Sequence, residues 1–239
     1  MQNGALVETL QKLLDKWMDA LTEHKRLNCR ELVPCDRLNA ISTFTRYFDA
    51  FATAENGADG DDTPMVENWF LFCLIWGIGG SLDDSGRRSF DAFVRELDTR
   101  FPTANTVFDY VLDVPSKSWL PWESRLSSSF RPPPGVPFFK ILVPTVDTFR
   151  NRFLATALVK QSHHVLFTGA VGVGKTMIAA AMLDELPDGR TSMSINFSAQ
   201  TSSNSLQARC RSTLRCEPTR TSIAALCLCA VPLVQSSGQ

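Results

Sequence analysis

The fold is decided by the stretch Val165-Leu166-Phe167-Thr168-Gly169-Ala170-Val171-Gly172-Val173-Gly174-Lys175-Thr176. It starts with a short apolar run, residues 165–167, which has the length and composition of a buried strand. Residues 169–176 follow with the spacing G-x-x-x-x-G-K-T. Apolar residues then recur at helical spacing, at Ile178, Met182 and Leu186. A strand, a glycine-rich loop and a helix in this order predict the first unit of an α/β fold.

Each residue type in this loop has a task in binding phosphate. Glycines permit positive φ angles, so backbone N–H groups can surround an anion at the positive end of the following helix. The Lys175 ammonium can reach β- and γ-phosphate oxygens, and the Thr176 hydroxyl can ligate the bridging Mg²⁺. The alternative is a chance octet on a glycine-rich turn. The predicted contacts with a nucleotide are Gly169, Ala170, Val171, Gly172, Val173, Gly174, Lys175, Thr176 and Met177, with Thr176 as the metal ligand.

Hydrolysis requires more than this loop. P-loop enzymes hold Mg²⁺ with an Asp at the end of another strand. The last acidic residue, Glu217, follows no apolar strand, and the apolar stretch 223–234 contains neither Asp nor Glu. The sequence therefore favours nucleotide binding and argues against an independent ATPase. We assign no catalytic residue, and whether the chain is an enzyme stays open.

Composition excludes several classes of protein. The 239 residues are 44% hydrophobic, enough for one domain or two small ones. A formal net charge of −1 gives no electrostatic case for nucleic acid. No signal segment follows Met1, and the longest apolar run, residues 69–78, is shorter than the roughly 20 residues that cross a bilayer. We expect neither nucleic acid nor membrane as a partner, and a cytoplasmic chain with reduced thiols.

The first half has the pattern of a helical bundle. Residues 5–23 form an amphipathic pattern, Asp36 can cap a second helix, and Thr63-Pro64 is typical of a third helix start. The third helix contains residues 69–76, which are apolar on all sides and therefore belong at the centre. A fourth helix is expected over residues 85–97.

The second half is predicted to be α/β. Residues 101–130 have an irregular pattern, and Arg131-Pro132-Pro133-Pro134-Gly135 is the best boundary. We expect a strand over 138–143, a helix over 147–159 and a second strand over 192–197. The predicted fold is thus a helical bundle followed by the first part of a P-loop α/β sheet, incomplete at the C-terminus. The expected parts are a helical domain over 1–114, a connecting segment over 115–136, a partial nucleotide-binding domain over 137–207 and a divergent tail over 208–239.

The tail contains four of the seven cysteines. They could be interpreted as a metal cluster, but their spacing is not that of a zinc site, and we favour a poorly ordered tail. The four are Cys210, Cys216, Cys227 and Cys229.

Segments of the chain resemble, in order, a dynein heavy chain. Residues 141–148, 169–176 and 195–204 are similar to the start of the third AAA+ module of the motor ring. Upstream, residues 69–80, 106–110 and 119–122 are similar to the helical lid of the second module and its connection to the third. The resemblance covers roughly residues 5 to 207, and residues 137–148 are closer to axonemal than to cytoplasmic heavy chains.

This resemblance implies part of a minus-end-directed microtubule motor whose loop binds ATP or ADP with Mg²⁺. Other heavy-chain modules, dynein complex subunits and, through the complete motor, microtubules would be its partners, in the cytoskeleton of a ciliary or flagellar axoneme. Compared with the family, we expect the linker, the first module, the stalk and the microtubule-binding domain to be missing from the chain as given. Two alternatives stay open: a non-enzymatic helical interaction or ring-packing fragment, and a small stand-alone P-loop enzyme, for which Asp147 is the nearest candidate acid.

Overall fold

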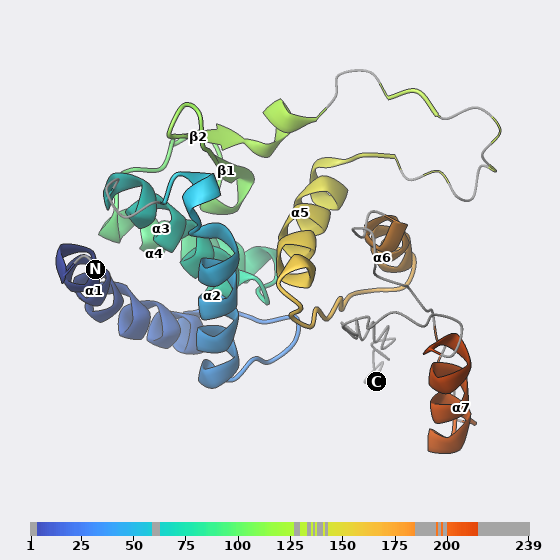
Figure 1. The fold of residues 1–239 in the computed structure, drawn as a ribbon. Coiled ribbons are helices and arrows are strands. Elements are labelled where there is room, and N and C mark those ends of the chain that lie inside the picture. Colours follow the sequence, from blue (N-terminus) through green and yellow to red (C-terminus); the bar gives the residue numbers. More distant parts are fainter. Residues whose placement is uncertain are drawn as a thin grey trace, which may run out of the picture.

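The structure is a computed structural model that describes residues 4–58, 63–126, 130–132, 135, 137, 141, 143–184, 195, 197 and 200–214. Helix α3 (Thr63–Gly79) is its central element, with every side chain from Trp69 to Trp76 buried. A helix that is apolar on all sides has to be surrounded by other elements. Figure 1 shows α1 (Gly4–Asn28), α2 (Arg37–Phe51) and α4 (Asp84–Leu97) packed around it, which confirms the predicted bundle.

Helices α2 and α4 each start directly after an aspartate, of which the sequence indicated only Asp36. Asp36 occupies the N-cap position of α2 with extended backbone, although its side chain makes no capping hydrogen bond. At α4 the N-cap is Asp83, whose side chain accepts a hydrogen bond from the Gly86 amide. A short 3-10 turn, η1 (Ala54–Asn56), follows α2 and accepts a hydrogen bond from the indole of Trp69. These contacts fix the ends of helices whose apolar faces form the core.

A β-hairpin covers one end of the bundle. Strands β1 (Tyr110–Asp113) and β2 (Ser118–Pro121) pair antiparallel, with Tyr110 opposite Pro121. The 3-10 turns η2 (Val107–Asp109) and η3 (Trp122–Arg125) flank the hairpin. The prediction of irregular structure over residues 101–130 is therefore wrong in this part. The strands are only four residues long and Pro115 and Pro121 interrupt the pattern, so periodicity could not reveal them.

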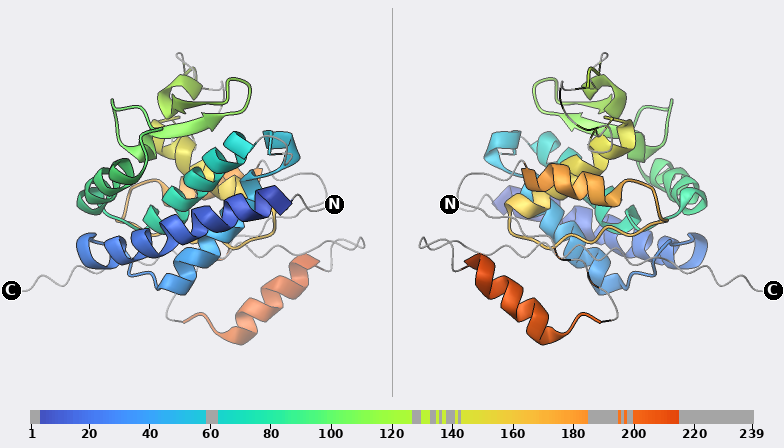
Figure 2. Two further views of the ribbon diagram at one scale, coloured as in Figure 1. Left: turned by 90° about the vertical axis from the view of Figure 1, so that its left-hand side faces the viewer. Right: turned by 90° about the vertical axis from the view of Figure 1, so that its right-hand side faces the viewer.

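Helix α5 (Val146–Lys160) confirms the helix expected over residues 147–159. The next helices are α6 (Lys175–Asp184) and α7 (Ser203–Leu214). Helix α5 contacts both α2 and α6, so it lies between the bundle and the glycine-rich loop. Figure 2 shows α7 extending away from the helices around α3. Helix α7 runs across Gln207, and residues 215–239 lie outside the described residues.

The strands expected in the second half do not form in the described residues. Residues 165–167 pair with no other strand, although Val165 and Phe167 pack against α5 and α6. Most of the other two expected strands, over 138–143 and 192–197, lies outside the described residues. A parallel sheet needs those neighbours, because a single strand cannot satisfy its backbone groups. In the described part of the chain, no helix combines the length and the apolar character that would let it cross a membrane.

Candidate functional site

The glycine-rich loop joins residues 163–168 to α6 through left-handed backbone. Gly172 has φ of 86° and Gly174 has φ of 81°. A Cβ built at either position would meet nothing within 4 Å, so backbone conformation rather than space requires glycine there. Between them Val173 is 56% exposed, and Val171 before them is 84% exposed. The loop is therefore an open turn with its outer side in solvent.

Lys175 is the first residue of α6 and folds back over the loop. Its Nζ donates hydrogen bonds to the carbonyl oxygens of Gly169 at 3.0 Å and Ala170 at 2.6 Å. The ammonium is thus held inside the turn by the same backbone that would surround an anion. Thr176 follows on the exposed side, and Met177 is half-buried. An incoming phosphate oxygen could replace the two carbonyl oxygens as acceptors of the ammonium.

The start of α6 adds a second positive feature. The amide of Ile178 donates to the Gly174 carbonyl at 2.9 Å, which begins the helical hydrogen bonds. The preceding first-turn N–H groups have no acceptor within the helix, and the helix dipole places partial positive charge there. These amides and the Lys175 ammonium together form the arrangement that binds anions at helix N-termini.

A small apolar core between α5 and α6 holds α6 in position. Ile178 and Met182 are buried against Ala155 and Val159 of α5, with the partly buried Val165 and Phe167 beside them. The loop itself contributes no side chain to this core. Its position therefore depends on α6, and the position of α6 depends on α5.

Asp147, the nearest acidic candidate in the sequence, is engaged elsewhere. Its Oδ1 accepts a hydrogen bond from the Arg150 guanidinium at 2.5 Å. Nothing in the sequence indicates that Arg150 is important, because an arginine beside the apolar residues of α5 looks like a surface residue. Tertiary packing buries it to 7% exposure. In the described part of the chain, no group of three or more His, Cys, Asp or Glu side chains is placed to hold a metal ion.

Comparisons with known proteins agree with the order of the two halves. The model of the "Dynein heavy chain AAA lid domain" matches residues 10–124, and that of the "P-loop containing dynein motor region" matches residues 130–221. The first match contains α3, α4 and the hairpin, and the second contains α5, the loop and α6. The two matches fit a helical bundle followed by a partial α/β P-loop fold.

Several long proteins are similar to the chain. The "Dynein-1-beta heavy chain, flagellar inner arm I1 complex" of Chlamydomonas reinhardtii is 51% identical over 240 residues, which cover 86% of this chain and 5% of that protein. "Dynein axonemal heavy chain 2" of Homo sapiens is 41% identical over 209 residues, covering 85% of this chain and 5% of that protein. The "Dynein alpha chain, flagellar outer arm" of Chlamydomonas reinhardtii is 28% identical over 215 residues, which cover 87% of this chain and 5% of that protein. The chain thus spans 5% of the length of each.

Proposed function

Because the chain belongs to the dynein heavy chain family, we propose that its glycine-rich loop binds ATP or ADP with Mg²⁺ as part of a motor ring. One observation carries this proposal. The Lys175 ammonium is held inside a left-handed turn that leads directly into α6. The donor set is entirely positive or N–H, which suits a polyphosphate and not a cation alone.

The proposed roles follow the predicted residues. Lys175 would hold the β- and γ-phosphates, and the Thr176 hydroxyl would hold Mg²⁺, which supplies charge neutralisation to the phosphates when bound. The backbone of residues 169–174 would surround the phosphates. Ala170, Val171, Val173 and Met177 would contribute through their backbone amides, since their side chains carry no polar group for a phosphate.

We further propose that this chain alone binds nucleotide without turning it over. In the described residues, the Lys175 ammonium bonds only backbone carbonyl oxygens, and Asp147 is paired with Arg150. Hydrolysis in P-loop proteins requires an acidic metal ligand and a residue that positions water. After the loop, the sequence contains no acidic residue at the end of an apolar strand.

The names of the relatives suggest a place for the motor. They are axonemal, flagellar inner arm and flagellar outer arm heavy chains. We propose that the chain corresponds to the lid of the second module and the start of the third in an axonemal motor. Its partners would then be other heavy-chain modules and dynein complex subunits, and microtubules through the complete motor.

The test is a titration of fluorescent ADP and ATP, each with Mg²⁺, followed by anisotropy. We expect Lys175→Ala to weaken binding by about 10-fold or more, because a charge-assisted hydrogen bond contributes about 1.5–3 kcal/mol. The matched control is Lys12→Ala, which removes an exposed lysine from α1. Equal affinity of the unaltered chain and Lys175→Ala would rule out the proposed site.

A second candidate function is a packing or interaction role for the bundle without nucleotide. It is favoured by the difference in size between the two apolar cores of the chain. Most of the buried apolar side chains belong to the core around α3, whereas the core beside the loop is small. Exposed leucines also lie near the α1–α2 connection, at Leu27, Leu32 and Leu38. A stably folded chain that binds no nucleotide in the titration would favour this second function.

A further inference from the structure

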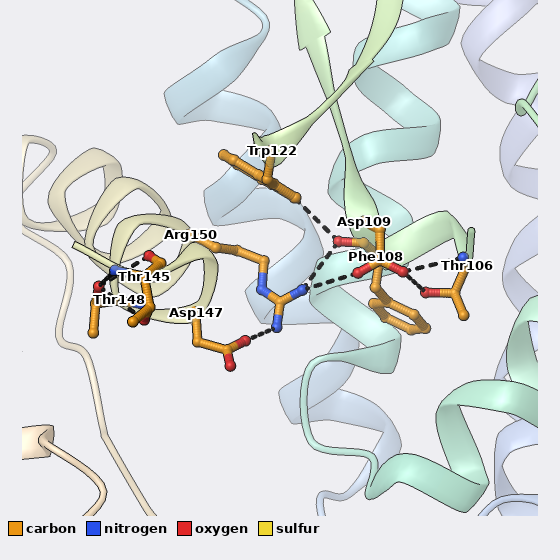
Figure 3. Close-up of polar contacts among 8 residues, drawn as sticks. All are labelled: Thr106, Phe108, Asp109, Trp122, Thr145, Asp147, Thr148 and Arg150. Carbon is orange, nitrogen blue, oxygen red and sulfur yellow. Dashed lines mark hydrogen bonds and ion pairs between the residues drawn. The ribbon is translucent and has the colours of Figure 1, made fainter. Parts of the chain in front are cut away.

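A buried arginine connects α5 to the lid, here meaning residues 10–124. Figure 3 shows the Arg150 guanidinium reaching across from α5 to η2. Its Nη1 lies 3.4 Å from the Phe108 carbonyl oxygen and 3.5 Å from Asp109 Oδ1, while Nη2 bonds Asp147 on its own helix. The side chain is 8% exposed, so this cation is largely removed from water. Two carboxylates balance its charge, as a buried cation requires.

The same guanidinium packs on an aromatic ring of the lid. It lies 5.4 Å from the centre of the Trp76 ring, within the range of a cation–π contact. Arg87 of α4 approaches the same ring at 6.0 Å, and burial together with the charge of Arg150 lowers the pKa of Arg87. Arg150 therefore occupies a defined place between two carboxylates, an aromatic ring and a second cation.

The backbone acceptor of Arg150 is shared with a lid tryptophan. The Phe108 carbonyl also accepts a hydrogen bond from the Trp122 indole at 3.1 Å, which Figure 3 draws beside the arginine contact. Trp122 in turn packs against Phe153 of α5, with ring centroids 5.4 Å apart. The polar and the aromatic contacts between α5 and the lid therefore meet at one point.

Helix α5 has two opposite apolar faces. Phe149, Phe153 and Leu154 face the lid core, while Ala155 and Val159 form the small core with α6. Residues two apart on a helix point to opposite sides, as Phe153 and Ala155 do. A displacement of α5 from the lid would therefore also displace the support on which α6 and Lys175 rest.

From this geometry we propose that Arg150 is a positioning residue for the nucleotide loop, since it fixes α5 against the lid and thereby holds α6 in its binding-competent place. The inference rests on the proposed function, because it assigns regulation of that same site to a residue outside it. Without Arg150, a smaller fraction of the molecules has α5 and α6 in the position that binds nucleotide. The apparent affinity for nucleotide falls in proportion to that fraction. By reciprocity, nucleotide bound at the loop strengthens the contact between α5 and the lid.

The experiment uses the full chain and measures two quantities. The first is the affinity for fluorescent ADP of the unaltered chain, Arg150→Ala, Arg150→Lys and the control Arg88→Ala, which removes an exposed arginine of α4. The second is hydrogen exchange of the amides of residues 107–112 with and without ADP. We expect Arg150→Ala to weaken affinity about 5-fold or more and to abolish the ADP-induced protection. Arg150→Lys should recover part of both, because lysine keeps the charge and loses the planar guanidinium.

The outcomes separate the two proposals. Failure of the unaltered chain to bind ADP overturns the proposed function and this inference together. Binding by the unaltered chain and equal binding by Arg150→Ala overturn the inference alone. Weakened binding with unchanged protection of residues 107–112 also overturns it, since the effect would not pass through the lid. If circular dichroism shows Arg150→Ala to be unfolded, Asp147→Asn replaces it, because Asp147 is 74% exposed and its loss should weaken affinity in the same direction.

Discussion

Gly77 of α3 lies against the backbone of Phe44 of α2. A Cβ at Gly77 would come within 2.6 Å of the Phe44 Cα and 2.7 Å of its amide nitrogen. Backbone atoms at that distance cannot yield as a flexible side chain can. The close contact lets Phe44 pack edge-on against Phe70, with ring centroids 5.1 Å apart. Glycine at this position therefore sets the separation of the two helices.

We expect Gly77→Ala to lower the free energy of unfolding by about 2–3 kcal/mol, in the range measured for overpacked cores. The added methyl has to push α2 away from α3. Urea denaturation followed by circular dichroism measures the change. Ser42→Ala on the exposed side of α2 is the control and should stay within about 0.5 kcal/mol of the unaltered chain. A Gly77→Ala chain of unchanged stability would mean that the helices are not in this contact.

The start of α4 should show a pH-dependent contribution from Asp83. Its carboxylate accepts hydrogen bonds from the Gly86 amide at 2.7 Å and the Ser85 hydroxyl at 2.8 Å. These bonds, the Gly86 amide first, lower the pKa of Asp83. Because the pKa of Asp83 is lower in the folded than in the unfolded chain, ionised Asp83 stabilises the folded chain at pH values above its unfolded pKa of about 3.9. This stabilisation is lost as the pH falls through the pKa of Asp83 in the folded chain.

Thermal melts should therefore show Asp83→Ala to be less stable than the unaltered chain at pH 7. The difference in Tm should narrow as pH falls below about 4. Asp83→Asn serves as the comparison, because it keeps an acceptor and cannot ionise. A Tm difference that is the same at neutral and acid pH would show that the ionised carboxylate is not the cause.

The thiol of Cys73 should not react with alkylating reagents in the folded chain. It is fully buried in α3, and burial raises its pKa well above the usual range. Because the thiolate is the reactive form, alkylation at pH 8 followed by mass spectrometry should modify the half-buried Cys35 before Cys73. Modification of Cys73 is expected only in urea. The raised pKa also means that its contribution to stability is complete below the unfolded pKa of about 8.5 and declines above it. Rapid labelling of Cys73 in the native chain would contradict its burial.

Gly174 should be needed for its backbone conformation. Its φ of 81° costs a residue with a side chain about 1–2 kcal/mol, although space for a Cβ is available. We expect Gly174→Ala to weaken nucleotide affinity by about 10-fold, because relief of that strain shifts the turn. Melting of the lid should not change, because the loop lies outside its core. Ala180→Ser, exposed on α6, is the control in the same anisotropy titration. Unchanged affinity of Gly174→Ala would show that nucleotide binding does not need this conformation.

Local sequence signals were sufficient for the helices of the bundle, for α5 and for the loop, whereas α7 was not predicted. Periodicity located α1 and α5 within a few residues, the Thr63-Pro64 start signal located α3, and the glycine spacing located the left-handed turn before α6. The hairpin was missed because each strand is too short for a periodic pattern, and its position depends on packing against α3. Local signals therefore identify an element only when it is long enough to carry its own pattern.

Arg150 illustrates what sequence alone could not provide. Its neighbours Phe149 and Phe153 indicated an apolar face, but nothing marked the arginine between them as buried. Its environment is built by Trp76, Phe108 and Asp109, which lie more than 40 positions away in the chain. Residues that act through tertiary contacts of this kind require the structure.

The most direct test of the central claim is calorimetric titration of ADP with Mg²⁺ into the chain and into Lys175→Ala. We expect one ADP to bind per chain, and this binding to be lost, or weakened about 10-fold or more, in the variant. Thermal melting of the lid should be the same in both, because the Lys175 ammonium donates its hydrogen bonds to carbonyl oxygens of the loop. The same binding heat for both chains, or none for the unaltered chain, would contradict the claim that this loop holds the nucleotide phosphates.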